Sequence, residues 1–500
     1  MTPYPVKGTP REHQLRALIE AAEKPGHCYF LDPGGGKTFV CIAEASKLWV
    51  DGKIDGVLIF APNRPHRQWV EEQFPLWCGI SWHGNHNQEP PGRMRKWLEA
   101  GERTKKTSMG VLAVNYEAAR TPKVKELIEK FRAIYPRIYL IVDESQKVKT
   151  PRAKRTLAIM AQALKSDYRR ILSGTPLLKG LEDLWSQYEI AQPGLGWPAE
   201  PIALSPRGKI NDFGYNGYKA HYCVEQQLAA NPRAKFIVGY RNQDHLRERV
   251  APHVTRVLSE EFSPQEKPDI IPVPITMSAE QTRRYNSMRD DLVAQIDDEL
   301  ITADNALVQM GKLLQIANGF LYREDRNEGW EQFSTTKVDD ALERIEMLRE
   351  RVIVWSPFIA QQQIFLIHAN DLNELKKWEP RGIYTKNTLE QWKEDPTGVL
   401  VGNQGSGLGV GLNLQMCAAN IYMANTFAAE QRWQSIARTD RMGQTRQVRV
   451  WDQISDDTLE VKVLAKLAQR AQLSRENIDA LRTDGDPIAT TLQEMRGLLT

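Results

Sequence analysis

The stretch HCYFLDPGGGKTFVCIAEASKLWV (27–50) decides the fold. HCYFLD predicts a buried strand, the three glycines predict a tight loop, and TFVCIAEASKLWV (38–50) predicts a helix. In this order, backbone N–H groups close around a phosphate and the helix directs its positive end at it. Lys37 is then placed to reach the β- and γ-phosphates of a nucleotide, and Thr38 to ligate Mg²⁺. The alternative is a glycine-rich surface turn before a helix.

Apolar, β-branched runs separated by polar helical stretches continue after this unit. They are GVLIFAP (56–62), SMGVLAVNY (108–116), IYLIVDE (138–144), RRILSGTP (169–176), RVIVWSPF (351–358), GVLVGNQ (398–404) and NIYMANTF (420–427). Such alternation is typical of an α/β fold with parallel sheets and helices on both faces. Residues 193–332 lack it and contain helical patterns, such as the one at 292–320. The sequence therefore predicts an N-terminal α/β lobe (1–192), a mainly helical middle (193–332), a second α/β lobe (333–485) and a short tail (486–500).

Composition excludes several classes of protein. The 500 residues are 41% hydrophobic and 26% charged, which is typical of a globular protein. No apolar run is long enough to span a membrane, and the N-terminus lacks the apolar core of a secretory signal. The five cysteines form no C-x-x-C pair, so neither a disulfide framework nor a zinc site is indicated, and we expect a reducing cytoplasm. The net charge of +3 leaves room for a local basic stripe that binds nucleic acid, without requiring one.

A pair of adjacent carboxylates ends the predicted strand IYLIVDES (138–145). Phosphoryl transfer to water needs one acidic group that holds the metal through water and another that orients the attacking water. Asp143 suits the first role and Glu144 the second. Taken alone, an Asp-Glu pair at a strand end is a solvated turn; after a phosphate loop, it indicates ATP hydrolysis.

A third motif, QRWQSIARTDRMGQ (431–444), lies in the second predicted lobe. On a helix, Gln434, Arg438 and Arg441 share one face. Arginines that a second lobe brings to a transferring phosphoryl group raise the rate by about 10³–10⁵ and make hydrolysis depend on lobe closure. We therefore expect ATP to lie between Lys37 and the Arg438/Arg441 pair. The alternative is a charged, solvated helix face.

With these three motifs in order, the chain resembles the Swi/Snf-like branch of superfamily-two helicases, which are double-stranded-DNA translocase ATPases, in the compact form found in phages and bacteria. Further segments carry the resemblance. They are PREHQLRAL (10–18), FAPNRPHRQWVEEQF (60–74), VLAVNYEAA (111–119), VDESQKVKTPRAKRT (142–156), LSGTPLLKGLEDLWS (172–186), SAEQTRRYNSM (278–288) and VGNQGSGLGVGLNLQMCAANIYM (401–423). In the order given, these segments resemble the Q motif, motif Ia, the strand segment that follows motif Ia, motif II, motif III, the helix start that opens the second half of the family's motor, and motif V.

The resemblance implies two RecA-like lobes, a DNA-dependent ATP hydrolase and the cofactors ATP and Mg²⁺. It assigns roles to further residues. ATP contacts would come from Arg11, Gln14, Gly34, Gly35, Gly36, Lys37 and Thr38. Coupling of ATP to DNA would involve Gln146, Ser173, Thr175, Gly409 and Gly411. DNA contacts would come from Arg64, Lys149 and Lys179.

The chain departs from the family pattern at four positions. Leu31 replaces the first glycine of the phosphate loop, and Lys179 stands where asparagine is more frequent. In motif II, Ser145 and Gln146 replace alanine or glycine followed by histidine. Gln146 keeps a donor and an acceptor, which we expect to bridge to Gln434 or Thr175. We therefore expect altered coupling of ATP to DNA and retained hydrolysis.

The basic residues of the motif segments are expected to line a groove that holds DNA phosphates. They are Arg64, His66, Arg67, Lys147, Lys149, Arg152, Lys154 and Arg155. Tyr116 and Trp355 are interpreted as core residues. The resulting hypothesis is a monomeric motor that translocates on double-stranded or branched DNA in a bacterial cell or phage-infected host, serving processes such as repair or recombination. Two alternatives stay open: a strand-separating or branch-migrating helicase acting on forks and four-way junctions, and an ATP-gated DNA clamp, which the Gln146 departure motivates.

Overall fold

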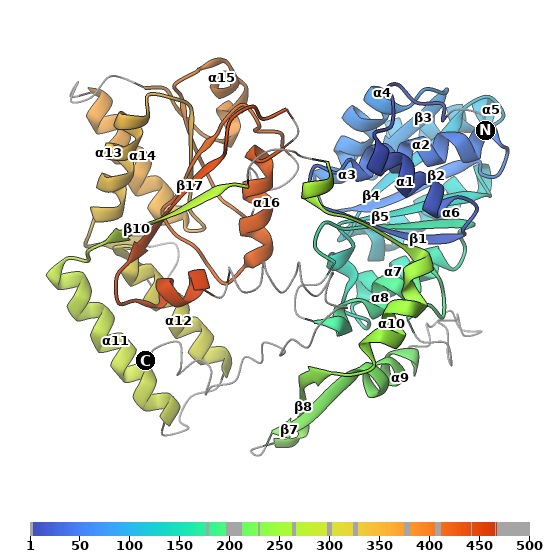
Figure 1. The fold of residues 1–500 in the computed structure, drawn as a ribbon. Coiled ribbons are helices and arrows are strands. Elements are labelled where there is room, and N and C mark those ends of the chain that lie inside the picture. Colours follow the sequence, from blue (N-terminus) through green and yellow to red (C-terminus); the bar gives the residue numbers. More distant parts are fainter. Residues whose placement is uncertain are drawn as a thin grey trace. The chain divides into compact units, whose positions relative to one another are not determined.

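The computed structural model describes residues 4–176, 180–196, 213–228, 231–262, 267–297, 303–323, 329–374, 381–405, 412–441, 443–465 and 467. The chain forms two compact units, with the division between Ser263 and Pro264 (Figure 1). Each unit contains one parallel sheet of the kind that the alternation of strands and helices predicts. Among the helices of the described residues, none has the length and apolarity needed to cross a membrane.

Unit 1 is built on a parallel sheet with the strand order β3-β4-β2-β5-β6-β1-β9 (Figure 1). The strands are β1 (Gly26–Leu31), β2 (Gly56–Ala61), β3 (Trp82–His86), β4 (Met109–Asn115), β5 (Ile138–Asp143), β6 (Tyr168–Leu172) and β9 (Val254–Val257). Every residue of β1, β2 and β4 is buried, because helices cover both faces of the sheet. Alternate residues enter two cores: Phe30 and Phe60 pack on one face, and Tyr29 and Ile59 on the other.

The helices of unit 1 connect these strands. They are α1 (Glu12–Ala21), α2 (Lys37–Val50), α3 (Pro65–Gln68), α4 (Phe74–Trp77), α5 (Pro91–Thr104), α6 (Pro122–Ile134), α7 (Lys154–Ala163) and α8 (Trp185–Ala191). After them come α9 (Phe213–Tyr222), the antiparallel hairpin of β7 (Cys223–Leu228) and β8 (Asn231–Tyr240), and α10 (Gln243–Val250). The order β5-β6-β1 places the ends of three predicted motif strands side by side at one edge of the sheet.

Unit 2 contains a second parallel sheet, with the order β10-β17-β16-β13-β15-β14 (Figure 1). Its strands are β10 (Asp269–Ile275), β13 (Val352–Trp355), β14 (Ile383–Tyr384), β15 (Val399–Gly402), β16 (Ala419–Tyr422) and β17 (Arg449–Ser455). Its helices are α11 (Ala279–Asp297), α12 (Ala303–Ala317), α13 (Thr336–Leu348), α14 (Ile359–Glu374), α15 (Leu389–Glu394) and α16 (Ala429–Thr439). A small hairpin joins β11 (Phe320–Tyr322) to β12 (Trp330–Gln332). Each unit is thus built on one parallel sheet with helices, in agreement with the predicted α/β fold.

The middle segment 193–332 contributes strands to both sheets. β9 pairs with β1 in unit 1, and β10 pairs with β17 in unit 2. Short strands at the edge of a sheet carry a weak sequence pattern because one side lacks a neighbouring strand. The three-part division at 192/193 and 332/333 stays a prediction. The tail at 486–500 lies outside the described residues.

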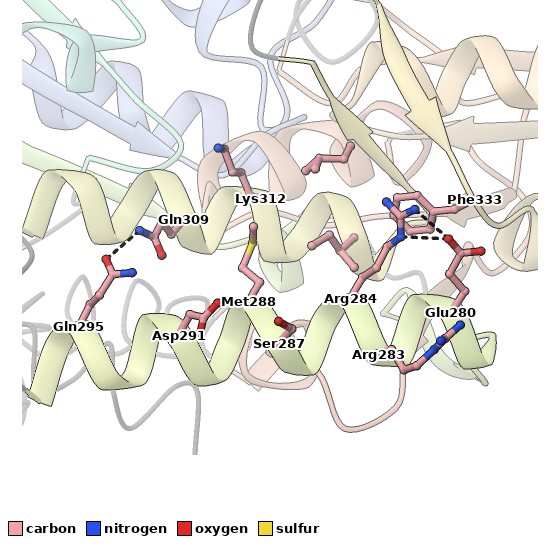
Figure 2. Close-up of a pocket in the computed structure, with 12 residues that line it drawn as sticks. Glu280, Arg283, Arg284, Ser287, Met288, Asp291, Gln295, Gln309, Lys312 and Phe333 are labelled. Carbon is pink, nitrogen blue, oxygen red and sulfur yellow. Dashed lines mark hydrogen bonds and ion pairs between the residues drawn. The ribbon is translucent and has the colours of Figure 1, made fainter.

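A groove of about 710 Å³ lies between α11 and α12 in unit 2 (Figure 2). Its lining mixes basic and acidic side chains, among them Arg283, Lys312 and Asp291. Arg284 forms ion pairs with Glu280 and Glu331, each 2.8 Å long. None of the predicted nucleotide-binding residues lines this groove.

A buried ion pair joins β6 to α2 in the core of unit 1. The guanidinium of Arg170 contacts both carboxylate oxygens of Glu44, with Nε donating to Oε2 over 2.8 Å. The hydroxyls of Tyr29 and Tyr139 donate to the same Oε2 over 2.8 and 2.7 Å. Arg170 is fully buried and Glu44 is 5% exposed. The pair ties the sheet to the helix that begins at the glycine loop.

Replacing Arg170 by methionine should destabilise unit 1 because it leaves the Glu44 carboxylate buried without its cation. We expect the free energy of unfolding to fall by about 3–5 kcal/mol, measured by urea denaturation followed by circular dichroism. Arg137→Met is the matched control. It removes an ion pair to Asp55 in which the arginine side chain is 49% exposed, and it should change stability by about 1 kcal/mol or less. Equal effects of the two substitutions would contradict the prediction.

Candidate active site

The glycine loop connects β1 to α2 as the sequence predicts. Gly34 and Gly36 adopt left-handed φ angles of 89° and 79°, which favour glycine. A Cβ on Gly36 would lie 2.1 Å from Nε2 of Gln14. Leu31, which replaces the first glycine of the family pattern, is the last residue of β1, and its side chain is buried in the core. The leucine is tolerated because it belongs to the strand.

Lys37 begins α2, and its side chain folds back over the loop. Its Nζ donates to the backbone carbonyl of Leu31 over 2.8 Å. Burial lowers the pKa of Lys37, and the carboxylates of Glu144 and Asp143 oppose that shift. The lysine is therefore within electrostatic reach of both acidic residues, as the hypothesis of a shared phosphate site requires.

The acidic pair lies at the end of β5. Asp143 Oδ2 accepts a hydrogen bond of 2.9 Å from the indole Nε1 of Trp69, and Oδ1 accepts one of 3.0 Å from the backbone N–H of Glu144. Burial, aided by the charge of Glu144, raises the pKa of Asp143 to about 6. A cation beside Asp143 would stabilise its charged form. Together with the hydroxyl of Thr38, this carboxylate offers the oxygen ligands that Mg²⁺ prefers.

A chain of hydrogen bonds leads from Glu144 to the segment after β6. Gln146 Nε2 donates to Glu144 Oε2 over 2.8 Å, and Gln146 Oε1 accepts from the hydroxyl of Ser173 over 2.7 Å. The Ser173 oxygen in turn accepts from the backbone N–H of Thr175 over 3.0 Å. Gln146 is 1% exposed and Ser173 is fully buried. Two proposed coupling residues, Ser173 and Thr175, are thereby connected to Glu144.

The two expected partners of Gln146 lie in different units. Within unit 1, Gln146 reaches Thr175 through Ser173. In unit 2, Gln434 Nε2 donates to Glu430 over 3.1 Å, and its bridge to Gln146 stays a prediction. Gln146 is suited to its bridge because its amide donates at one end and accepts at the other.

Helix α1 contacts the opposite side of the loop. Gln14 Oε1 accepts from the backbone N–H of Arg11 over 3.0 Å, which caps the helix. His13 Nε2 lies 3.0 Å from the carbonyl of Gly35, and its ring centroid is 5.1 Å from that of Phe262. His13 was missed in the sequence although it precedes Gln14 in the Q-motif segment. Phe262 has no sequence signal, because only the fold brings it to the loop.

The arginines of unit 2 differ from the predicted arrangement. Helix α16 ends at Thr439, so Gln434 and Arg438 lie on the helix and Arg441 follows it. The prediction that all three share one helical face is therefore wrong for Arg441. Arg438 and Arg441 nevertheless both donate to the carbonyl of Leu412, each over 3.4 Å. The turn after α16 thus brings the two guanidinium groups to one carbonyl.

The residues expected to contact DNA are only partly described. Arg64 precedes α3 with a φ of 77°, and Lys149 forms an ion pair of 3.1 Å with Asp183. His66 is fully buried, so its expected place in a phosphate-binding groove is wrong. Lys179, Gly409 and Gly411 lie outside the described residues.

Tyr116 and Trp355 are core residues, as interpreted from the sequence. Tyr116 is 1% exposed, and its hydroxyl donates to the backbone carbonyl of Asp143. Trp355 is fully buried and donates from Nε1 to Asn420 over 3.0 Å. Neither ring is available to stack on a base.

Gly36→Ala should weaken nucleotide binding. A left-handed backbone is unfavourable for alanine by about 1–2 kcal/mol, and its Cβ would displace Gln14. We expect the dissociation constant for a fluorescent ATP analogue to rise at least about tenfold, the ratio that about 1.4 kcal/mol produces. Gly92→Ala in α5, where an added Cβ meets no atom within 4 Å, is the control. Wild-type affinity in Gly36→Ala would show that the loop does not hold phosphate.

One known family matches part of the chain, and individual known proteins are similar to it over almost its full length. Residues 13–197 match the SNF2-related domain family. A putative protein p41 of Acyrthosiphon pisum secondary endosymbiont phage 1 is 25% identical over 95% of this chain and 99% of its own length. The SWI/SNF chromatin-remodeling complex subunit snf22 of Schizosaccharomyces pombe is 23% identical over 96% of this chain, which spans only 28% of that protein.

Two further similarities are more limited. Human DNA excision repair protein ERCC-6 is 29% identical over 32% of this chain, which covers 11% of that protein. A Sulfolobus solfataricus SWI2/SNF2 ATPase core, solved with double-stranded DNA, aligns over the whole chain with 20% identity and a TM-score of 0.41. Residues 13–197 thus match the SNF2-related domain family, and the chain is similar over almost its full length to a subunit of a SWI/SNF complex.

Proposed function

We propose that the protein is a DNA-stimulated ATPase that translocates on double-stranded DNA and displaces or remodels what it meets. The observation that carries the proposal is the grouping of the glycine loop, the Asp143–Glu144 pair and the Ser173 segment at the ends of β1, β5 and β6. This edge of a parallel sheet is where α/β proteins bind nucleotides.

In the proposed reaction, the loop N–H groups and Lys37 bind the β- and γ-phosphates, and Gln14 and Arg11 contact the adenine end. Thr38 and Asp143 would hold Mg²⁺, which would neutralise charge on the phosphates. Glu144 orients a water molecule for attack on the γ-phosphorus. As the new P–O bond forms, the bond to the β-phosphate oxygen breaks, and ADP leaves with that electron pair. Glu144 accepts the water proton.

The second lobe would complete the site. Arg438 and Arg441 are held together by their shared contact with the Leu412 carbonyl. Burial lowers the pKa of Arg441, and guanidinium groups in proteins remain charged. We propose that closure of the lobes brings this pair to the γ-phosphate. Hydrolysis then depends on lobe closure, and alternate opening and closing drives stepping.

Gln146 would report the state of Glu144 to the Ser173–Thr175 segment. The bridge consists of a hydrogen bond of 2.8 Å to the Glu144 carboxylate and one of 2.7 Å from the Ser173 hydroxyl. Any movement of Glu144 during hydrolysis would shift Gln146 and Ser173, and through them Thr175. Thr175 precedes the segment that contains Lys179, a proposed DNA contact. The glutamine thus performs by hydrogen bonding alone what a histidine in this position would perform with the added option of a charge.

Duplex DNA is proposed as the track. Relatives described as DNA excision repair and chromatin-remodeling proteins support it. Arg64 and Lys149 would contact phosphates, which predicts little sequence preference and a strong dependence on salt. Similarity to a phage protein over its whole length supports action as a compact motor in the cytoplasm of a bacterial cell or infected host.

Phosphate release should rise when duplex DNA is added to the wild type and should fall to background in Lys37→Ala, because the loop loses its cation for the β- and γ-phosphates. Lys47→Ala on the same helix is the control; Lys47 pairs with Asp51 near the surface, and its loss should leave the rate unchanged. The same assay should be repeated with single-stranded DNA, a DNA fork, a four-way DNA junction and RNA in place of the duplex. A wild type no faster than Lys37→Ala on any of them would overturn the motor hypothesis. Strand separation on a plain fork would favour a helicase.

Arg441→Ala should leave ATP binding nearly intact while the rate of hydrolysis falls by about 10³–10⁵, because the guanidinium acts on charge that develops during transfer. Arg446→Ala removes an exposed arginine that pairs with Glu350 and should leave both quantities near wild type. Binding is measured with a fluorescent nucleotide and hydrolysis by phosphate release. Equal losses of binding and hydrolysis in Arg441→Ala would contradict the proposed role.

A further inference from the structure

Trp69 makes a direct contact with the acidic pair. Its indole Nε1 donates to Asp143 Oδ2 over 2.9 Å. The side chain is only 2% exposed and packs in the core near Phe74, with 6.4 Å between the ring centroids. The hydrogen bond therefore joins a rigid, buried ring to the carboxylate.

The sheet explains why Trp69 lies there. β2 neighbours β5, with Phe60 opposite Val142 in the register, so the chain that leaves β2 runs beside the end of β5. α3 follows, and a single π-helical turn, Trp69–Gln73, begins at the tryptophan itself. Turns of this kind inside helices are frequent at functional sites, because the wider turn redirects a side chain.

The Asp143 carboxylate is held from two sides. Trp69 donates to Oδ2, and the backbone N–H of Glu144 donates to Oδ1. Glu144 itself has a left-handed φ of 52°. Donors on both oxygens fix the rotation of the carboxylate plane. A carboxylate held in this way presents its remaining lone pairs in one direction.

We propose that Trp69 is a positioning residue, whose N–H holds the Asp143 carboxylate in the orientation that binds the hydrated Mg²⁺ of the nucleotide. The inference rests on the proposed metal role of Asp143. Groups that orient a metal-binding side chain typically contribute 10- to 100-fold to metal affinity or activity. Trp69 would thereby make a buried segment after β2 part of the ATP site.

The test compares Trp69→Phe with Trp97→Phe. Both substitutions remove an indole N–H from a largely buried ring in unit 1. Trp97 stacks on His83 and Phe131, and its Nε1 is buried without a hydrogen-bond partner among the described residues. The two variants therefore lose similar packing, and only one loses a bond to Asp143.

The readout is the Mg²⁺ concentration that half-saturates binding of a fluorescent ATP analogue, together with the same midpoint for phosphate release. In Trp69→Phe both midpoints should rise by about 10- to 100-fold, while Trp97→Phe should match the wild type. At saturating Mg²⁺ the hydrolysis rate of Trp69→Phe should recover toward the wild-type rate. A merely structural role would lower the melting temperature and the folded fraction without moving the Mg²⁺ midpoint.

Midpoints in Trp69→Phe that equal those of Trp97→Phe would overturn the inference while leaving the proposed ATPase intact. Nucleotide binding by the wild type that is independent of Mg²⁺ would instead contradict the metal role of Asp143. Should Trp69→Phe melt well below Trp97→Phe, Trp69→His, which keeps a ring N–H, is titrated beside Trp69→Leu. A lower Mg²⁺ midpoint in the histidine variant supports the inference, and equal midpoints overturn it.

Discussion

Parallel pairing of β1, β6 and β5 is the constraint on which the rest of unit 1 depends. Because the strands run in one direction, their carboxyl ends meet at one edge, and the register sets Asp143 opposite Leu172. The glycine loop, the acidic pair and the Ser173 segment each follow one of these strands. Burial of both faces keeps the strands in place, and the Arg170–Glu44 pair ties β6 to the helix that begins at the loop. The site is thus a consequence of strand order.

Within that edge, hydrogen bonds to the carboxylates determine how the acidic residues are presented. Trp69 and the Glu144 backbone hold Asp143, and Gln146 holds Glu144. A buried donor that is paired with a buried acceptor contributes to stability, whereas a buried polar group left without a partner costs free energy. The glutamine in motif II is satisfied on both sides, so its difference from the family pattern leaves the network complete. The replacement changes the charge that the position can carry.

In unit 2, the guanidinium groups of Arg438 and Arg441 are positioned by a backbone carbonyl. Arg441 lies beyond the end of α16, yet it meets Arg438 at the carbonyl of Leu412. A backbone acceptor brings the two like charges together. A pair of guanidinium groups at one point is the arrangement proposed for stabilising charge on a phosphate.

The sequence by itself determined the central strands and the residues of the motifs. Largely apolar runs identify β1, β2, β4 and β5 because such runs suit a strand covered on both faces. The glycine loop, Asp143 and Glu144 follow them directly, so their common edge could be inferred from local pattern. Leu31 was a departure from the family in the sequence and proved to be the last residue of a strand.

Only the tertiary structure decided the edge strands and the contacts between motifs. The edge strands β3, β9, β10 and β14 are defined by the partners they bond to, which local composition does not encode. The same holds for the Trp69–Asp143 bond, the position of Phe262 beside His13, and the end of α16 before Arg441. Each joins residues that are far apart in the chain or depends on where a helix stops. Periodicity predicts which face a side chain occupies, whereas its partner is set by the packing of elements distant in sequence.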